Sequence, residues 1–304
     1  MAWFRRKRNE TAQAENAANT ASDRRMFSFG GRRHLADAPY VLPKDMGEIK
    51  RLDFQHFLLR NGLNGNYAAP IGQPRSILDV GCGTGRWAME LASNFPNANV
   101  VGVDLVPTEE VTYGYGLERR PENYVFVQGN ILEGLPFADG NFDFIHQRLL
   151  IAALPAARWP GVVGELVRVT TRGGWVELQE CGVPQDGGPG FMALWASWIE
   201  LCKRRGIDFA MGHTIGDKLK SAGLANVHMR QVDFPMGRFG GSVGVASATD
   251  CLAVGQALKA GVVGMGIYSE LNYDRLYAQA QQEFKQPRGR GHLPFYVACG
   301  QRVI

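Results

Sequence analysis

An apolar strand that runs directly into a glycine-rich loop constrains this chain more than any other feature. Residues 77–85 read Ile-Leu-Asp-Val-Gly-Cys-Gly-Thr-Gly, and residues 87–95 then have the pattern of a helix. A second apolar strand at 100–103 ends at Asp104. A strand, a glycine turn, a helix and a second strand ending in an acidic residue predict a parallel βαβ unit. Such a unit binds a nucleotide-bearing cofactor at the carboxyl edge of its sheet.

The charge of Asp79, two residues before the first glycine, favours one cofactor over another. A carboxylate there repels a diphosphate, but it attracts the ammonium and sulfonium groups of S-adenosylmethionine. One such charge pair, at about 4 Å and an effective dielectric near 20, contributes roughly 4 kcal/mol before desolvation. The sequence therefore favours S-adenosylmethionine over a nicotinamide dinucleotide, the alternative being a structural turn with an incidental aspartate. The predicted cofactor-binding residues of this unit are Asp79, Gly81, Cys82, Gly83, Gly85, Trp87, Asp104 (for the ribose hydroxyls) and Leu105.

Composition sets the broad class of protein. With 304 residues, 45% of them apolar, the chain can bury a large α/β core, and its net charge of +4 gives no case for a nucleic-acid surface. The five cysteines are scattered without metal-ligand spacing, so we expect reduced thiols, no metal and a cytoplasmic location. No secretory signal is visible, and the apolar stretch 251–267 contains Lys259, so we expect a soluble protein.

Composition and the pattern of apolar residues divide the sequence into three segments. Residues 1–34 form a polar leader that we expect to be mobile. Its run of basic residues, 5–8, has two interpretations: a nuclear import or nucleic-acid arm, or, favoured, a solvated tail. Residues 17–27 leave room for a short helix that docks on a neighbouring subunit. Residues 35–72 are predicted to form a helical cover, with a helix near 48–60, and residues 73–304 hold the sheet.

The sheet is predicted from strands that alternate with helices, which implies parallel pairing with right-handed crossovers. The predicted strands are 76–80, 99–104, 124–128, 142–146, 173–180, 226–234 and 294–302. The predicted helices are 86–95, 110–117, 158–171, 190–205 and 214–222. Two further helical segments at about 235–290 interrupt the last two strands, so we expect them to form a lid over the active-site edge.

Several of these motifs together resemble class I S-adenosylmethionine-dependent methyltransferases. The general motifs are residues 77–85, Asp104 and the pair Asn130 and Ile131 after the third strand. Segments 40–45, 51–56, 144–148 and 294–301 are similar to the LaeA-like group. That group includes fungal regulators of secondary metabolism and bacterial enzymes that methylate natural products, among them C-methyltransferases of the teleocidin type.

The resemblance implies a Rossmann-like seven-stranded sheet of order 3-2-1-4-5-7-6, with only the seventh strand antiparallel. It implies that Gly81, Gly83 and Gly85 lie beside the methionine part of the cofactor and that Gln147 meets the methionine end. Asn130 and Ile131 would flank the adenine. The family more often has an aspartate at position 130, and asparagine keeps an acceptor for the adenine amine without the charge.

The base for the reaction depends on the acceptor. A phenol, amine or acid gains from a general base, whereas an alkene needs one only when a cation must lose its proton. The candidates are Glu180 at the end of the fifth strand, His146 at the end of the fourth and His213 in a later loop. Each has a structural alternative: Glu180 as a buried hydrogen-bonding group, and His146 as a packed strand-end residue.

The acceptor itself is predicted to be apolar. Aromatic and methionine residues are frequent after the fifth strand, although each one alone could belong to the core. The predicted substrate-binding residues are Tyr40, His56, Phe191, Trp195 and Trp198. The partner of Arg148 stays open: it could bind the cofactor carboxylate, an anionic substrate group or a helix-end carbonyl. Arg51 could reach the active site, or it could pair with Glu48 or Asp53.

These observations predict a methyltransferase for a small, largely apolar metabolite, acting on C, O or N in secondary metabolism. Two alternatives stay open: a LaeA-like cofactor-binding regulator without metabolite turnover, and a methyltransferase for a protein or nucleic acid. We expect no membrane and no nucleic-acid partner, and a homo-oligomer through the N-terminal segment stays open.

Overall fold

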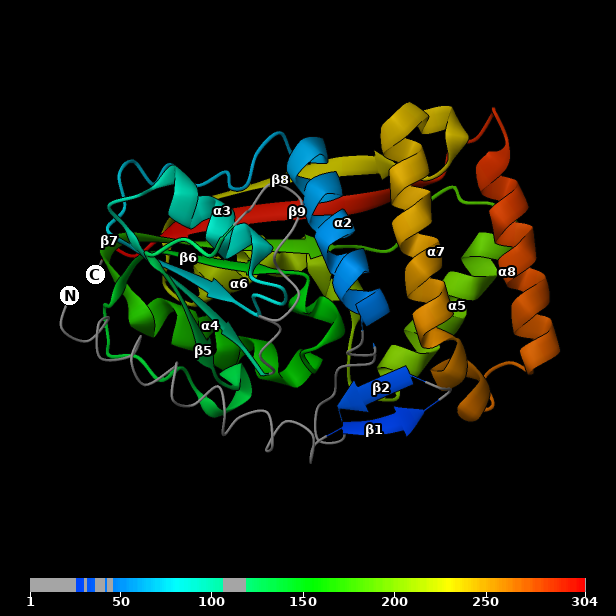
Figure 1. Cartoon of the computed structure of the whole chain (residues 1–304), viewed down its shortest axis with the longest axis horizontal. Helices are drawn as coiled ribbons and strands as arrows, with labels where there is room; N and C mark the ends of the chain where they lie inside the picture. The colour runs from blue at the N-terminus through cyan, green and yellow to red at the C-terminus, as the bar shows by residue number, and fades with distance from the viewer. Residues whose placement is uncertain (1–25, 30–31, 36–41, 43–45, 106–118, 304) are drawn as a thin grey trace.

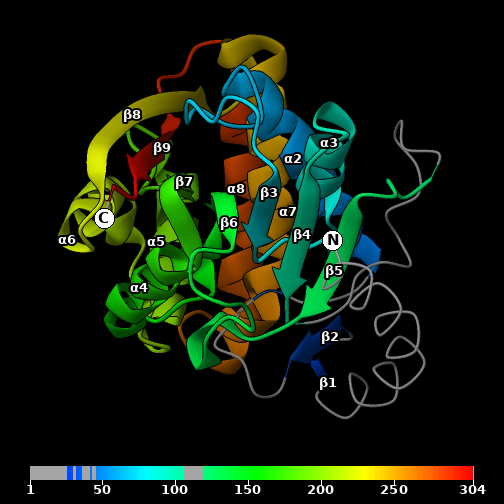
Figure 2. The same ribbon diagram turned by 90° about the vertical axis from the view of Figure 1, so that its left-hand side faces the viewer.

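A seven-stranded sheet forms the centre of the protein (Figures 1 and 2). The computed structural model describes residues 26–29, 32–35, 42, 46–105 and 119–303. The strands are β3 (Ser76–Val80), β4 (Asn99–Asp104), β5 (Tyr124–Gln128), β6 (Phe142–Arg148), β7 (Thr170–Cys181), β8 (Ala225–Pro235) and β9 (His292–Gln301). Their spatial order is β5-β4-β3-β6-β7-β9-β8, which is 3-2-1-4-5-7-6 counted along the chain. Only β9 runs antiparallel to its neighbours, so the predicted topology is confirmed.

Alternating side chains give the sheet a hydrophobic core on each face. In β3, Ile77 packs with helix α3 (Arg86–Asn94), while Leu78 packs with α4 (Trp159–Val169) and α6 (Ile215–Ser221). Figure 2 shows α3 on one side of the sheet and α4 and α6 on the other. Because both faces are covered, the central parallel strands are almost continuously apolar, which is why they stand out in the sequence.

A third core lies outside the sheet, among three helices (Figure 1). They are α5 (Pro189–Lys203), α7 (Gly241–Gly264) and α8 (Glu270–Lys285). Strands β8 and β9 pair in antiparallel fashion, and α7 and α8 lie between them in the chain. The predicted helical segments between the last two strands are therefore present. None of the helices in the described ranges combines the length and apolar character that crossing a membrane demands.

Helix α2 (Met46–Gly62) lies between this helical core and the glycine loop (Figure 1). Ahead of it, β1 (Met26–Phe29) and β2 (Arg32–Leu35) form an antiparallel pair, so the short helix considered over 17–27 is wrong where it includes Met26 and Phe27. The rest of the predicted leader, Tyr40 and the predicted helix 110–117 lie outside the described residues. Short 3-10 turns complete the chain: η2 (Ile131–Glu133), η3 (Leu150–Ala152), η4 (Ala156–Arg158), η5 (Phe209–Thr214) and η6 (Arg238–Gly240).

The three-helix core generates a prediction at Tyr273. Its fully buried hydroxyl accepts from Trp198 Nε1 (2.9 Å) and donates to the carbonyl of Gly255 (2.6 Å). Tyr273→Phe leaves both partners unpaired, so we expect a loss of about 1–3 kcal/mol in the free energy of unfolding, measured by urea denaturation. The control is Tyr268→Phe, whose half-buried hydroxyl lies 3.4 Å from Ala193 O and should lose under about 0.5 kcal/mol. Equal losses in the two variants would contradict this account.

Candidate active site

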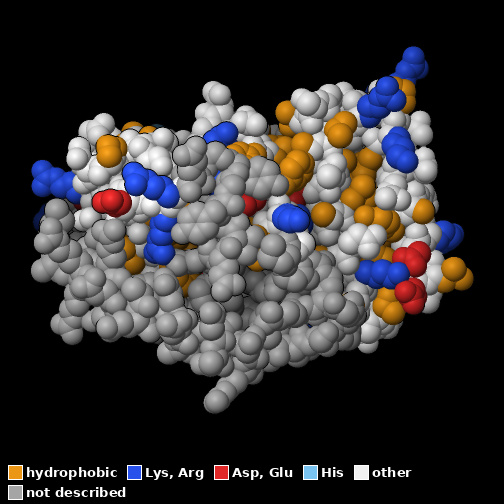
Figure 3. Space-filling view, viewed as in Figure 1, with side chains coloured by type: hydrophobic (Ala, Val, Ile, Leu, Met, Phe, Trp, Pro, Cys, Tyr) orange, Lys and Arg blue, Asp and Glu red, His pale blue; other side chains and the backbone are white. Residues whose placement is uncertain are grey.

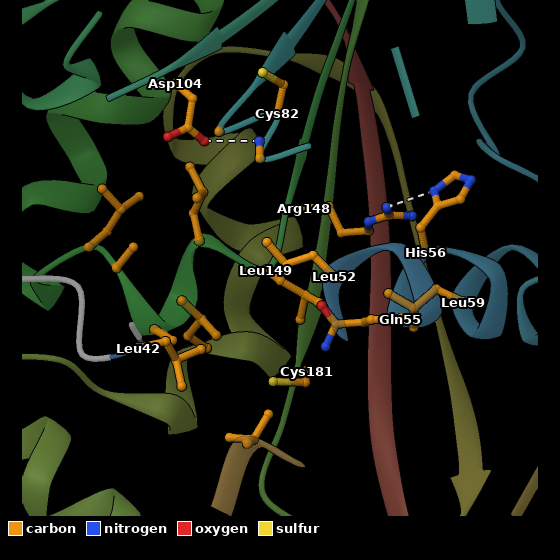
Figure 4. A pocket seen from close by; sticks show the side chains of 18 of the residues that line it. Leu42, Leu52, Gln55, His56, Leu59, Cys82, Asp104, Arg148, Leu149 and Cys181 are labelled. Carbon is orange, nitrogen blue, oxygen red and sulfur yellow. Dashed lines mark hydrogen bonds between the residues drawn. The ribbon is translucent and has the colours of Figure 1, made fainter. Parts of the chain in front are cut away.

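A cavity of about 770 Å³ opens at the carboxyl ends of β3, β4 and β6 (Figure 4). Its walls are the sheet edge, helix α2 and the inner faces of α5 and α7. Pockets for small ligands span roughly 300–1,000 Å³, so this volume suits a large ligand or two smaller ones. One half carries charged residues along the sheet edge, and the other half is apolar.

The glycine loop between β3 and α3 shapes the charged half. Gly81, Gly83 and Gly85 have φ of 69°, 56° and 73°, a left-handed conformation that favours glycine. A Cβ on Gly81 would also lie 2.5 Å from Leu150 Cδ2. The Gly83 N–H donates to Asp104 Oδ2 at 2.9 Å, so the loop and the end of β4 are held together. The loop backbone therefore approaches the cavity closely, as the sequence predicted.

Nine of the predicted cofactor-binding residues line the cavity. They are Asp79, Gly81, Cys82, Gly83, Trp87, Asp104, Leu105, Asn130 and Ile131. Gly85 lies behind the loop, where a Cβ would meet the Tyr124 hydroxyl at 2.6 Å, so its contribution is the turn itself. These residues come from the ends of β3, β4 and β5 and from the start of α3, which brings positions far apart in the sequence to one edge.

Asn130 has a structural task in addition to its place in the wall. Its Oδ1 accepts from the Leu132 N–H (3.0 Å), and its Nδ2 donates to Glu133 Oε1 (2.8 Å), so it caps η2. An aspartate could accept the first hydrogen bond but could not donate the second. This explains the asparagine where the resembling family more often has an aspartate.

His146 and Asp79 form a buried pair at the centre of the edge. The two residues are register partners on β6 and β3, and His146 Nδ1 lies 2.9 Å from Asp79 Oδ1. The imidazole stacks on the indole of Trp87, with the ring centroids 3.8 Å apart and an angle of 6° between planes. His146 Nε2 has no hydrogen-bond partner among the described residues. A carboxylate that fixes Nδ1–H and leaves Nε2 to accept a proton is an arrangement suited to a general base.

The structure corrects the placement of the other two predicted catalytic residues. Glu180 is fully buried, does not line the cavity, and accepts from the backbone N–H groups of Leu150 (3.0 Å) and Ile151 (3.1 Å). Burial raises the pKa of Glu180 to about 8, although those hydrogen bonds oppose the shift. His213 is exposed on η5, with its ring 6.4 Å from that of Tyr296. Only His146 of the three candidates faces the cavity.

Two further placements differ from the predictions. Gln147 is fully buried, and because side chains alternate along a strand it points away from the cavity that His146 and Arg148 line. Arg148 lines the cavity from β6 where Gln147 was expected to do so. Phe191 is also fully buried and packs against Trp195 and Phe284 in the helical core rather than in the wall.

The apolar half of the cavity lies between α5 and α7. Trp195 and Trp198 line it as predicted, and residues at helical spacing on α7 face them. Its apolar lining includes Trp195, Trp198, Ile199, Phe209, Cys251, Val254, Leu258 and Leu293. His56, predicted for the substrate, lines the cavity from α2 and contacts Arg148.

A polar cluster closes this half, and it contains the Arg51–Glu48 pair that the sequence left open, together with Asp250 and Gln55, which it did not reveal. Arg51 on α2 donates to Glu48 (2.7 Å) and to Asp250 Oδ1 on α7 (2.9 Å), and Gln55 donates to Asp250 Oδ2 (2.8 Å). Asp250 belongs to no motif. Its charge within an otherwise apolar stretch of helix could have indicated a buried ion pair, because a charged side chain is rarely buried without a partner.

Comparisons with known proteins agree with this geometry. Residues 77–174 match the family described as methyltransferase domain. Methyltransferase str3 of Strobilurus tenacellus is 30% identical over 208 residues, which covers 66% of this chain and 72% of that protein. Secondary metabolism regulator laeA of Aspergillus flavus is 28% identical over 249 residues, 77% of this chain and 64% of the regulator. Among solved structures, the YcgJ protein from Bacillus subtilis shares the fold, with a TM-score of 0.50, 16% identity, and coverage of 82% of this chain and 98% of that one.

The raised pKa of Glu180 generates a prediction about stability. The folded pKa of about 8 exceeds the ordinary 4.5, so the protonated carboxyl stabilises the fold below pH 4.5, and this contribution is lost as the pH rises through 8. The free energy of unfolding should therefore fall with pH relative to Glu180→Gln, by up to about 5 kcal/mol between pH 4.5 and 8. Urea unfolding at several pH values measures this. Glu200→Gln, at an exposed pair with Arg204, is the control, and parallel curves for wild type and Glu180→Gln would contradict the buried assignment.

Proposed function

Because this chain belongs to the class I S-adenosylmethionine-dependent methyltransferases, in the LaeA-like group, we propose that it methylates a small, largely apolar metabolite in natural-product biosynthesis. The observation that carries the proposal is a single cavity with two halves. A charged sheet edge fits the cofactor, and an apolar chamber between α5 and α7 fits the acceptor.

The residues at the edge fit S-adenosylmethionine. The carboxylate of Asp79 suits the ammonium of the methionine part, and that of Asp104 suits the ribose hydroxyls. Gly81 and Gly83 leave a cradle where side chains would otherwise stand, and Asn130 and Ile131 offer a wall for the adenine. Asp79, at the end of β3, makes the first turn unfavourable for a diphosphate.

The chemistry supplied by the bound cofactor is a methyl group on a sulfonium, transferred by in-line displacement. The walls from α2, α5 and α7 hold the acceptor and exclude water from it. If the acceptor is a phenol or an amine, His146 Nε2 takes the proton that the acceptor loses. Asp79 then stabilises the imidazolium through Nδ1–H. Glu180 takes no part in this scheme because it lies outside the cavity.

A second candidate function is that of a cofactor-binding regulator without metabolite turnover. The similarity to secondary metabolism regulator laeA favours it. Under that alternative, removal of residues 1–34 abolishes function in cells and leaves cofactor binding intact. A nucleic-acid substrate has less support, since the net charge is only +4 and, among the described residues visible in Figure 3, Lys and Arg side chains are dispersed rather than gathered in one patch. A gel-shift assay with DNA and RNA separates this case.

Asp104 generates a prediction about cofactor affinity. We expect Asp104→Ala to weaken binding of S-adenosylmethionine by about 1–3 kcal/mol in calorimetric titration, because charge-assisted hydrogen bonds to the ribose are lost. The control is Asp217→Ala, at an exposed pair with Lys220 on α6, which should bind as the wild type does. Unchanged affinity in Asp104→Ala would remove the ribose assignment.

Turnover is tested by incubating the protein with methyl-labelled cofactor and a metabolite extract, followed by mass spectrometry. We expect label in an apolar metabolite. We expect that label to fall at least about tenfold in His146→Phe for an O- or N-linked product, while cofactor binding persists. Cofactor binding without any labelled metabolite across extracts would favour the regulator.

A further inference from the structure

Arg148 at the end of β6 is a cation on the cavity wall. Its Nη2 lies 3.1 Å from Nδ1 of His56, and Figure 4 shows this contact on one side of the cavity, across from Asp104 and Cys82. No carboxylate among the described residues lies within ion-pair distance of the Arg148 guanidinium, whose one described partner is that imidazole. Burial lowers the pKa of Arg148, and more distant carboxylates, first Asp79, oppose the shift.

The imidazole that holds Arg148 is neutral, because burial lowers the pKa of His56. Its Nε2 lies 3.1 Å from Glu90 Oε1 on α3. Burial alone would raise the pKa of Glu90, but the contact with His56 and hydrogen bonds from Asn66 and Arg60 lower it to about 2, so it is ionised. Because Nε2 lies beside this carboxylate and Nδ1 lies beside the Arg148 guanidinium, we place the ring proton on Nε2, which leaves Nδ1 to accept from Arg148.

This arrangement holds the guanidinium in place without neutralising it. Arg148 has five N–H donors, and a neutral ring nitrogen uses one of them. A partly buried cation without an anion is costly, and a planar guanidinium matches a carboxylate in two parallel hydrogen bonds. The missing anion is therefore best supplied by a ligand carboxylate.

The position of Arg148 on the edge selects the ligand. Strand β6 pairs with β3, whose end carries Asp79 and the glycine loop, and β4 with Asp104 lies on the other side of β3. A nucleoside at β4 places its amino-acid tail at the junction of β3 and β6. There Asp79 and Arg148 offer opposite charges, as an α-ammonium and an α-carboxylate require. The acceptor chamber lies farther away, between α5 and α7.

We propose that Arg148 binds the α-carboxylate of the cofactor's methionine moiety and that His56 and Glu90 are its positioning residues. This inference rests on the proposed function. It assigns His56 to the cofactor end of the cavity rather than to the substrate. It also makes helix α2, through His56, part of the cofactor site.

The test pairs a change in the protein with a change in the ligand. Calorimetric titration compares S-adenosylmethionine with its decarboxylated analogue, which lacks only the carboxylate, on wild type and on Arg148→Met. We expect the wild type to bind the analogue about 10- to 100-fold more weakly, and Arg148→Met to bind both ligands with affinities within about threefold of each other. Arg60→Met, which also removes a cation contacting Glu90 but one outside the cavity wall, should keep the wild-type preference.

The role of His56 is tested by the same measurement, the preference for S-adenosylmethionine over its decarboxylated analogue. His56→Asn keeps a polar group that can accept from Arg148 and should keep most of the preference for the carboxylate, whereas His56→Phe should reduce it at least about fivefold. Circular dichroism checks folding. If Arg148→Met fails to fold, Arg148→Lys, which keeps the charge and loses the planar fork, should show a reduced preference.

The other outcomes of these titrations contradict the inference or the proposed function in distinguishable ways. If Arg148→Met retains the wild-type preference, the inference is overturned. If it leaves both cofactor affinities unchanged and instead weakens binding of carboxylate-bearing acceptors, the inference is also overturned, and the anion belongs to the acceptor. A wild type that binds neither cofactor form contradicts the proposed function itself, which is a different failure.

Discussion

The cavity depends on how helix α2 is held against α3, α7, β6 and the glycine loop. Arg51 pairs with Asp250 on α7, and Asp53 accepts from Thr84 in the glycine loop and lies 3.6 Å from Arg86 of α3. His56 contacts Glu90 of α3 and Arg148 of β6. These contacts are buried or nearly so, and removing one partner of such a pair typically costs about 3–5 kcal/mol. Helix α2 is thereby a shared wall of both halves of the cavity.

Helix α2 therefore connects the two halves of the cavity. It contacts the glycine loop, the strand that carries Arg148 and helix α7, which lines the apolar half. Under the proposal for Arg148, a cofactor carboxylate bound there would also stabilise the docked position of α2. Polar contacts thus fix the geometry, while Trp195, Trp198, Val254 and Leu258 supply the surface that an acceptor meets.

The sequence predicted most of the fold and the nucleotide end of the site, because both follow local rules. Residues 77–85 carry a strand and a turn that leads into a helix, so the positions of Asp79 and Gly81 could be foreseen, and the apolar strand at 100–103 placed Asp104. Glu180 and Gln147 were misplaced because a strand-end residue can face either side of the sheet, and the sequence does not give the register with neighbouring strands. Asp250 pairs with Arg51 across 199 positions, a contact no local pattern carries.

The most direct measurement is a crystal structure of the protein grown with both S-adenosylmethionine and NAD. The account predicts S-adenosylmethionine alone in the cavity, with its ribose at Asp104 and its amino-acid tail at the end of β3. NAD in that place, or both ligands absent from a cavity filled by the protein's own side chains, would contradict the central claim that this edge selects a positively charged methyl donor over a phosphate.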